Sequence, residues 1–445
     1  MILALLSNAR KYLLFITLLH AVFFVLALYK GNIQLPDSGD YIWQAKNFEA
    51  TGSFYANDPT QPIKIDYYSK RPPLYGLFIW GVTSIFGSLY AVLLLQNIIS
   101  IFCSWLVYKL LRDDFGIEKP ALWAGILWVL FPNQLLYANM VMSETLLQAF
   151  LTGAFYCFLR YLKTNKQYWI IGNTALLILA LLTKPVMLYF WVISLVVLLI
   201  FAIKNRHYFL PLTVVLLPLV AYWWSGVNYQ ETGYRHYSSI THVNLKDYNT
   251  KYFLFAKYGS EYGDSVIVVI DSAVAKKGSY AQQCEYIKDT CKQILLSDVP
   301  AYGKFHARGM LNFMADPGRY DYVSFFNIPQ TDGLGLLHYI SKGDIGELKR
   351  FIKTQPIALI IVLLLQMIAN VLILLMCVVF VFIKTPLWPK IYLLVMAGYI
   401  WFLTGPIGSA RFKVPVYPLL VVAVVVAIYN CKPLIHKIKI GKNKA

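Results

Sequence analysis

The sequence predicts an all-α membrane protein with about ten transmembrane helices, and three observations support this fold class. Of the 445 residues, 58% are hydrophobic and only 14% are charged, whereas about a quarter of the residues of a soluble domain are charged. Apolar runs recur along the chain, and roughly 20 apolar residues in a helix are enough to cross the hydrocarbon core. The net charge of +18 fits basic inner loops and contact with anionic lipid better than nucleic-acid binding.

Ten apolar runs are candidate spans. The first, 12–29, is longer than the core of a signal peptide and has no cleavage site of small residues, so we expect a retained span. The others are 89–111, 120–138, 142–162, 168–182, 186–203, 208–226, 356–383, 388–404 and 412–430. An eleventh run, 72–87, is short and begins with two prolines.

The positions of lysine and arginine decide between ten and eleven spans. If 72–87 is an interfacial or re-entrant helix on the outer surface, every short basic loop falls on the inner side, as the positive-inside rule requires. If 72–87 crossed, those loops would be divided between the two faces. Tyr75, Phe78 and Trp80 also suit the interface. We therefore predict ten spans, with the basic loop residues Arg112, Lys119, Lys163, Lys166, Lys204, Arg206, Lys384 and Lys390 inside.

This arrangement divides the chain into four parts. Residues 1–226 form a membrane module that includes the first outer loop, 30–88. Residues 227–355 form a soluble segment on the outer side, residues 356–431 return to the membrane, and residues 432–445 form a basic inner tail.

We predict that the outer soluble segment is a small region that mixes strands and helix. Runs such as DSVIVVID favour strands because they are rich in β-branched residues. An amphipathic helix is expected from about Ala281 to Met314. Cys284 and Cys291 would lie on this helix roughly 10 Å apart, which is too far for a disulfide.

Two carboxylates, Asp37 and Asp40, follow the first span at the predicted outer surface. An acid here can cap the helix that begins in PDSGDYIWQAKNF. A carboxylate pair can also act as a general base. The residues alone leave both interpretations open.

Basic residues fall on the same predicted face. Lys70 and Arg71 precede the interfacial helix, Lys184 follows a span in LALLTKPVML, and Arg411 precedes the last span in GPIGSARFK. Such side chains can reach lipid headgroups. They can also bind a phosphate, to which arginine offers a fork and lysine a point charge.

The first outer loop carries the most specific pattern. Asp37 is followed four residues later by Tyr41 at the start of an amphipathic helix, and a basic-Pro-Pro-Leu-Tyr helix begins at Arg71 and ends at Gly87. This pattern resembles the GT-C glycosyltransferases of the protein mannosyltransferase and aminoarabinose transferase type.

Three later motifs resemble the same family and come in its order. FPNQLLYANMVMSETL carries Tyr137 and Glu144, LALLTKPVML carries Lys184, and ARFKVPVYPLL carries Arg411. Together the motifs cover most of the membrane part.

The resemblance implies a GT-C fold and an enzyme that transfers a hexose or pentose from a polyprenyl-phosphate donor to an acceptor hydroxyl on the outer face. An aspartate would take the proton of that hydroxyl. Many relatives have Asp-Glu where Ser38 here follows Asp37, so the base is Asp37 or Asp40, with Asp37 preferred. Fixed cations would stabilise the lipid phosphate as it leaves.

The remaining roles follow from the same resemblance. The predicted phosphate-binding residues are Lys70, Arg71, Lys184 and Arg411, and the predicted sugar- or acceptor-binding residues are Tyr41, Tyr137 and Glu144. No cofactor is required besides the donor substrate, no residue is assigned to a metal, and dependence on a divalent metal stays open. We expect a multi-pass protein of the cell inner membrane with its active site on the periplasmic face.

Two other functions remain alternatives. A flippase or transporter of lipid-linked glycans would need charges buried along a path through its spans, and an O-antigen polymerase or ligase is expected to have its key arginines in the large outer loop. The expected partners are membrane lipid, the donor, and a glycan, lipid or protein acceptor, without nucleic acid.

Overall fold

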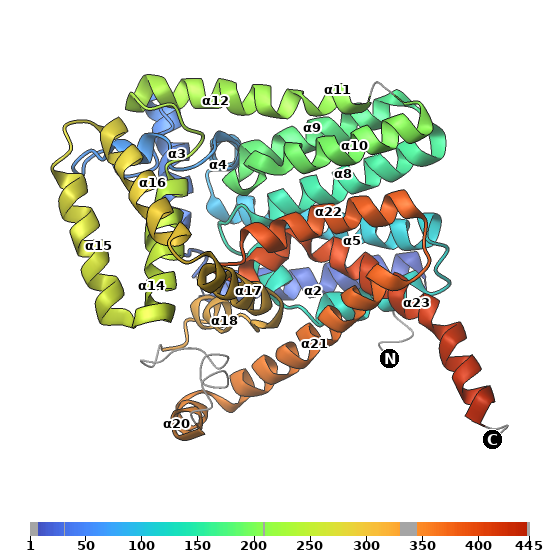
Figure 1. Cartoon of the computed structure of the whole chain (residues 1–445). Helices are drawn as coiled ribbons and strands as arrows, with labels where there is room; N and C mark the ends of the chain where they lie inside the picture. The colour runs from blue at the N-terminus through green and yellow to red at the C-terminus, as the bar shows by residue number, and fades with distance from the viewer. Residues whose placement is uncertain (1–7, 31, 208–209, 330–344, 443–445) are drawn as a thin grey trace.

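The computed structural model describes residues 8–30, 32–207, 210–329 and 345–442, and every regular element among them is helical (Figure 1). Each predicted span coincides with one or two helices. These are α2 (Ala9–Lys30), α5 (Leu89–Lys109), α6 (Pro120–Val129) with α7 (Asn133–Ala138), α8 (Glu144–Thr164), α9 (Gln167–Thr183), α10 (Phe190–Asn205), α11 (Leu210–Val214) with α12 (Leu216–Thr232), α21 (Ile357–Phe382), α22 (Leu387–Leu403) and α23 (Tyr417–Lys442).

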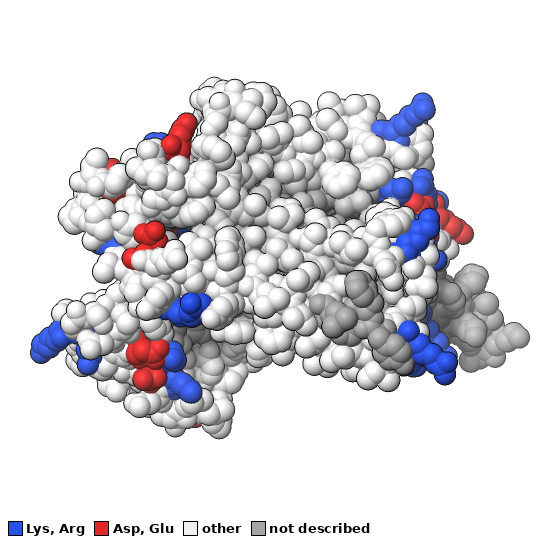
Figure 2. Space-filling view, turned by 90° about the horizontal axis from the view of Figure 1, so that it is seen from above, with Lys and Arg blue, Asp and Glu red and all other residues white. Residues whose placement is uncertain are grey.

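The helices have the lengths and composition of a multi-pass membrane protein. Among the described residues, 5 helical segments are long and apolar enough to cross a membrane: Ala9–Tyr29, Leu89–Asp114, Pro185–Asn205, Ile357–Phe382 and Ala410–Cys431. Shorter apolar helices accompany them, and the set agrees with about ten spans. Figure 2 shows charged side chains gathered towards the two ends of the molecule, with a broad uncharged band between them.

The ambiguous run 72–87 forms α4 (Pro73–Phe86), a helix of 14 residues. It begins at Pro73, because proline fits the first turn of a helix, and it ends at Gly87, whose φ is +66°. A helix of this length extends roughly 21 Å, which is shorter than the hydrocarbon core of about 30 Å. The element therefore has the dimensions of the predicted interfacial helix.

The basic loops that we assigned to one side do lie together. Asp114, Lys163, Asn205 and Pro386 come from four of these loops and line one cavity of about 410 Å³. Asp114 forms ion pairs with Arg160 and Lys163 at this end of the molecule. The side chains of the basic tail, 432–445, lie outside the described residues, and the division of the chain into four parts stays a prediction.

The outer segment is helical in its described residues, so the expectation of strands there was wrong. It contains α13 (Ile240–Val243), η4 (Asn244–Thr250), α14 (Lys251–Tyr258), α15 (Ser260–Ala275), α16 (Tyr280–Leu296), α17 (Val299–Ala315), α18 (Arg319–Phe325) and α20 (Ile345–Thr354). The run DSVIVVID lies inside α15. Ile267 and Ile270, three residues apart, pack on Cys291 of α16, so helical packing overrides the β preference of the run.

The single amphipathic helix expected from Ala281 to Met314 is two helices, α16 and α17. The helix is interrupted at Asp298, whose carboxylate accepts a hydrogen bond from the backbone N–H of Ala301 at 3.0 Å. Pro300 lies in the first turn of α17. An N-cap and a proline together begin a new helix here. Cys284 and Cys291 on α16 are both free thiols.

Candidate active site

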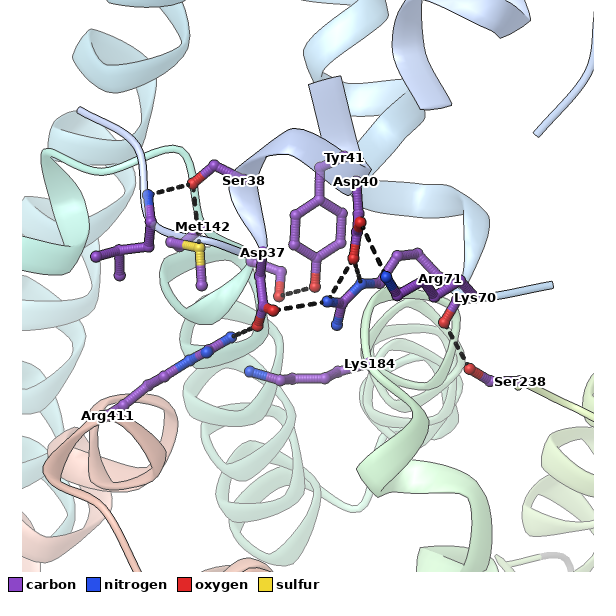
Figure 3. A network of polar contacts seen from close by, with 12 residues as sticks. Asp37, Ser38, Asp40, Tyr41, Lys70, Arg71, Met142, Lys184, Ser238 and Arg411 are labelled. Carbon is purple, nitrogen blue, oxygen red and sulfur yellow. Dashed lines mark hydrogen bonds and ion pairs between the residues drawn. The ribbon is translucent and has the colours of Figure 1, made fainter. Parts of the chain in front are cut away.

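Seven charged side chains meet in one network, and all seven are residues that the sequence singled out. Figure 3 labels all of them except Glu144. They come from distant parts of the chain: Asp37 and Asp40 at the start of α3 (Ser38–Thr51), Lys70 and Arg71 before α4, Glu144 at the first position of α8, Lys184 between α9 and η3 (Pro185–Tyr189), and Arg411 in η5 (Ala410–Val416). Three carboxylates and four cations leave one net positive charge. We refer to these seven residues as the charge network.

Asp37 lies at the centre of the charge network between two arginines. Its Oδ1 is 2.9 Å from NH2 of Arg71, and its Oδ2 is 2.7 Å from NH2 of Arg411. Although Asp37 occupies the N-cap position of α3, its side chain makes no capping hydrogen bond. The carboxylate is therefore directed to the arginines, and helix capping does not explain it.

The protonation of Asp37 follows from these neighbours. Burial alone raises the pKa of its carboxyl, but Arg71 and Arg411 lower it more, so the pKa lies well below its usual range. The side chain is 30% exposed, compared with 11% for Asp40 and 0% for Glu144. Asp37 is the most accessible carboxylate of the charge network.

Asp40 forms ion pairs with Lys70 and Arg71, the two basic residues before α4. Arg71 donates to its Oδ2 from Nε at 2.9 Å and from NH2 at 2.7 Å, and Lys70 Nζ lies 3.2 Å from its Oδ1. The guanidinium of Arg71 also lies over the ring of Tyr41, with 5.0 Å to the ring centroid. Asp40 and Tyr41 thus fix the position of Arg71, which is 5% exposed.

Glu144 joins the remaining two cations. Its Oε1 accepts hydrogen bonds from Lys184 Nζ, at 2.6 Å, and from Arg411 Nε. Its Oε2 is buried and has no hydrogen-bond partner among the described residues. A buried acceptor without a donor costs free energy, so this oxygen is available to a donor group of a ligand.

The charge of Lys184 is sensitive to pH. Burial lowers the pKa of its ammonium to about 8, against the opposing effect of Glu144. In Figure 3 its side chain points towards the space between Asp37 and Arg411.

The two tyrosines predicted to contact sugar are enclosed by protein. Tyr41 is 1% exposed and its hydroxyl lies 3.1 Å from Ser143 Oγ. Tyr137 is 0% exposed, and its hydroxyl donates to Oδ1 of Asp321 at 2.7 Å. In this structure both therefore support neighbouring elements, and contact with sugar stays a prediction.

Asp321, in α18, was missed by the sequence analysis. It accepts hydrogen bonds from Tyr137 and, at 2.6 Å, from Asn133 Nδ2, and so attaches the outer segment to α7. Burial raises the pKa of its carboxyl to about 7. An acid between aromatic residues in RYDYVSF gives no local signal of this contact.

The loop that carries Arg411 is held by α17. A Cβ atom on Gly309 of α17 would lie 1.7 Å from the carbonyl oxygen of Gly405, so only glycine allows this approach. Asp316, just beyond α17, accepts a hydrogen bond from the backbone N–H of Ala410 at 2.8 Å. The sequence did not predict these contacts, which fix the backbone that precedes Arg411.

Comparison with known proteins agrees with the resemblance over part of the chain. Residues 70–224 match the model of the family described as dolichyl-phosphate-mannose-protein mannosyltransferase. This range contains four members of the charge network, Lys70, Arg71, Glu144 and Lys184. The chain is also similar to ArnT from Cupriavidus metallidurans in a crystal structure bound to undecaprenyl phosphate, with 13% identity, a TM-score of 0.43, and coverage of 95% of this chain and 78% of that chain. No curated protein matches.

Proposed function

We propose that this chain is a glycosyltransferase of the cell inner membrane that moves a sugar from a polyprenyl-phosphate donor to an acceptor hydroxyl on the periplasmic face. The observation that carries the proposal is the charge network, in which two of the four cations, Arg71 and Arg411, pair with the accessible carboxylate of Asp37 at the ends of membrane helices. The match of residues 70–224 to a family that uses a lipid-phosphate-linked sugar supports the same chemistry.

The cations of the charge network suit the donor phosphate. A phosphodiester carries one negative charge, and Arg71, Lys184 and Arg411 present guanidinium and ammonium donors from three elements. Charge-assisted hydrogen bonds of this kind are roughly twice as strong as neutral ones. When the bond from the sugar to the phosphate breaks, the phosphate gains negative charge, which fixed cations in a partly buried site stabilise. We expect this arrangement to work without a cofactor.

Asp37 is the residue that we assign as general base. The acceptor oxygen attacks the anomeric carbon, the carbon–oxygen bond to the phosphate breaks, and the hydroxyl proton passes to the carboxylate. At rest the two arginines hold the pKa of Asp37 low, which makes it a weak base. A donor phosphate that takes hydrogen bonds from Arg71 and Arg411 would release Asp37 from them, and its pKa would rise.

The other carboxylates have supporting roles in this proposal. Asp40 holds Arg71 with two hydrogen bonds, so it keeps the phosphate ligand in place. Glu144 has one unpartnered oxygen, which can accept a hydrogen bond from a hydroxyl of the transferred sugar. Tyr41 and Tyr137 would act by positioning Arg71 and α18.

Release of sugar to water tests this function without knowledge of the acceptor. The purified protein in lipid nanodiscs is given a panel of labelled polyprenyl-phosphate sugars, and free sugar is measured for wild type, Arg71→Gln and Lys46→Gln. Lys46 is an exposed lysine of α3 outside the charge network, so its variant should match wild type. We expect release in wild type and a loss of donor binding in Arg71→Gln. Absence of both donor binding and release across the panel would contradict the proposal, and donor binding without release would favour a transporter.

A further inference from the structure

A second cavity, of about 420 Å³, lies next to the charge network and has no part in the chemistry described so far. Three stretches of chain line it: the first outer loop, the residues from Ser239 to Asp247, and the start of α16. Its volume falls within the range of small-molecule pockets. We refer to it as the outer cavity.

Side chains of both charges line the outer cavity: Asp66 and Asp247 provide carboxylates, and Lys64 and Lys246 provide ammonium groups. Asp247 Oδ1 lies 3.5 Å from Lys246 Nζ. Nδ1 of His242 is buried and has no hydrogen-bond partner in the described part of the chain. Burial lowers the pKa of His242 to about 4, so the ring is neutral at neutral pH. Gln283 adds an amide.

Two aromatic rings, those of Tyr280 and His242, line the same cavity, and the rings of Tyr234 and His236 pack against them. Tyr280 lies 5.9 Å from His236 and 6.5 Å from Tyr234, measured between ring centroids, and His242 lies 5.8 Å from Tyr234. An aromatic surface beside carboxylate, amide and imidazole acceptors suits a ligand with many hydroxyls and apolar ring faces, since each hydroxyl donates one hydrogen bond. Because two lysines balance the two carboxylates, the lining favours a neutral ligand over one with a large net charge.

The outer cavity and the charge network share one wall, the segment 66–71. On one side of this segment, Lys70 and Arg71 reach Asp40. On the other side, Asp66 faces the outer cavity. The backbone between them is fixed by Ser239 Oγ, which donates to the carbonyl of Asp66 at 2.6 Å. Ser238 Oγ donates to the carbonyl of Lys70 at 2.7 Å, as Figure 3 shows.

We propose that the outer cavity binds the acceptor and that the acceptor is a glycan of neutral sugars. The proposal rests on the proposed function, because it names the acceptor of that reaction. One sugar of the glycan occupies the outer cavity, and the chain passes the 66–71 wall to place its reactive hydroxyl at Asp37. Reaction joins that oxygen to the anomeric carbon, the proton goes to Asp37, and the lipid phosphate leaves.

The test separates transfer from release of sugar to water. The protein in nanodiscs receives a labelled donor that supports release, together with a pool of short neutral oligosaccharides, and glycosylated products are measured by mass spectrometry. The outer-cavity variants are Asp66→Asn and Gln283→Ala. Gln293→Ala is the matched control, because Gln293 is an exposed residue of the same helix, α16, outside the outer cavity.

We expect both outer-cavity variants to raise the acceptor KM about five-fold or more, which corresponds to one lost hydrogen bond, while release of sugar to water and the control stay at the wild-type level. Retained release also shows that these variants fold. Transfer with an unchanged acceptor KM in both variants would overturn the inference. Release without transfer to any oligosaccharide, with transfer to a lipid or peptide acceptor instead, would overturn it while leaving the proposed function in place. No release at all would overturn the proposed function itself.

Discussion

Asp37 and Arg411, from opposite ends of the chain, form an ion pair with 2.7 Å between Oδ2 and NH2. The same guanidinium also donates from Nε to Glu144. One arginine before the last span therefore links the first outer loop to the start of α8. The charge network exists only when these three segments are packed together, so its members should respond to substitution as a unit.

Asp37→Asn should lower the rate of sugar transfer by at least about 100-fold, the usual contribution of a general base. Donor affinity should hold or increase, because the substitution removes a carboxylate that competes with the phosphate for Arg71 and Arg411. Measurement of kcat and donor binding together checks both parts. Asp40→Asn is the comparison, and it should mainly weaken donor binding, because it frees Arg71. A larger loss of kcat in Asp40→Asn than in Asp37→Asn would assign the base to Asp40.

Arg411→Gln should weaken donor binding about ten-fold or more and also lower thermal stability. The loss of stability is expected because it leaves the buried Glu144 with Lys184 as its one cation, and an uncompensated buried charge is costly. Arg411→Lys keeps a positive charge at this position, so its melting temperature should fall less than that of Arg411→Gln, while donor binding stays weak because the guanidinium fork is lost. Wild-type donor binding in Arg411→Lys would mean that the fork is not needed.

Donor binding should weaken as the pH rises through about 8. Burial lowers the pKa of Lys184 to about 8, so its ammonium is charged below that pH and loses its proton above it. In Lys184→Arg the guanidinium stays protonated, and the alkaline loss of affinity should disappear or move to higher pH. Donor Kd measured across this range for the two proteins is decisive, since identical profiles would assign the titration to another group.

Gly309→Ala should destabilise the protein by roughly 1–3 kcal/mol, the usual range for overpacking, and should weaken donor binding. The new methyl group would meet the carbonyl of Gly405 and displace the loop that carries Arg411. Gly303→Ala on the same helix is the control, because its Cβ would meet nothing within 4 Å, and alanine should stabilise α17 there by about 0.5–1 kcal/mol. Equal melting temperatures for the two variants would contradict the packing argument.

Asp321→Asn should make stability less dependent on pH. Burial raises the pKa of Asp321 to about 7, above its value in the unfolded chain. This acid therefore favours the folded state at low pH, and the contribution is lost as the pH rises through about 7. The variant should melt above wild type at pH 8, since Asn133 has an unpartnered Oδ1 that can accept from the new amide. A variant that melts below wild type at every pH would show that the charged form is favourable.

The sequence predicted the membrane helices and singled out the seven residues that meet in the charge network, while the roles of these residues stay predictions. Apolar runs need only length to form spans, and charged residues at the ends of spans are rare enough to be conspicuous. Asp321, Asp316 and Gly309 were missed because their partners, Tyr137, Ala410 and Gly405, lie far away in the sequence. The strand expected at DSVIVVID was wrong for a related reason, because its neighbour α16 is set by tertiary packing and not by local preference.

The single excess positive charge of the charge network has a consequence for turnover. The loaded donor brings one negative charge and balances it. The spent carrier is a phosphomonoester, which bears about −1.5 to −2 at neutral pH, so the same four cations should hold it more tightly than the donor. Product inhibition by the carrier lipid is then built into the site, and the sustained rate in a cell depends on how quickly the membrane recycles that lipid.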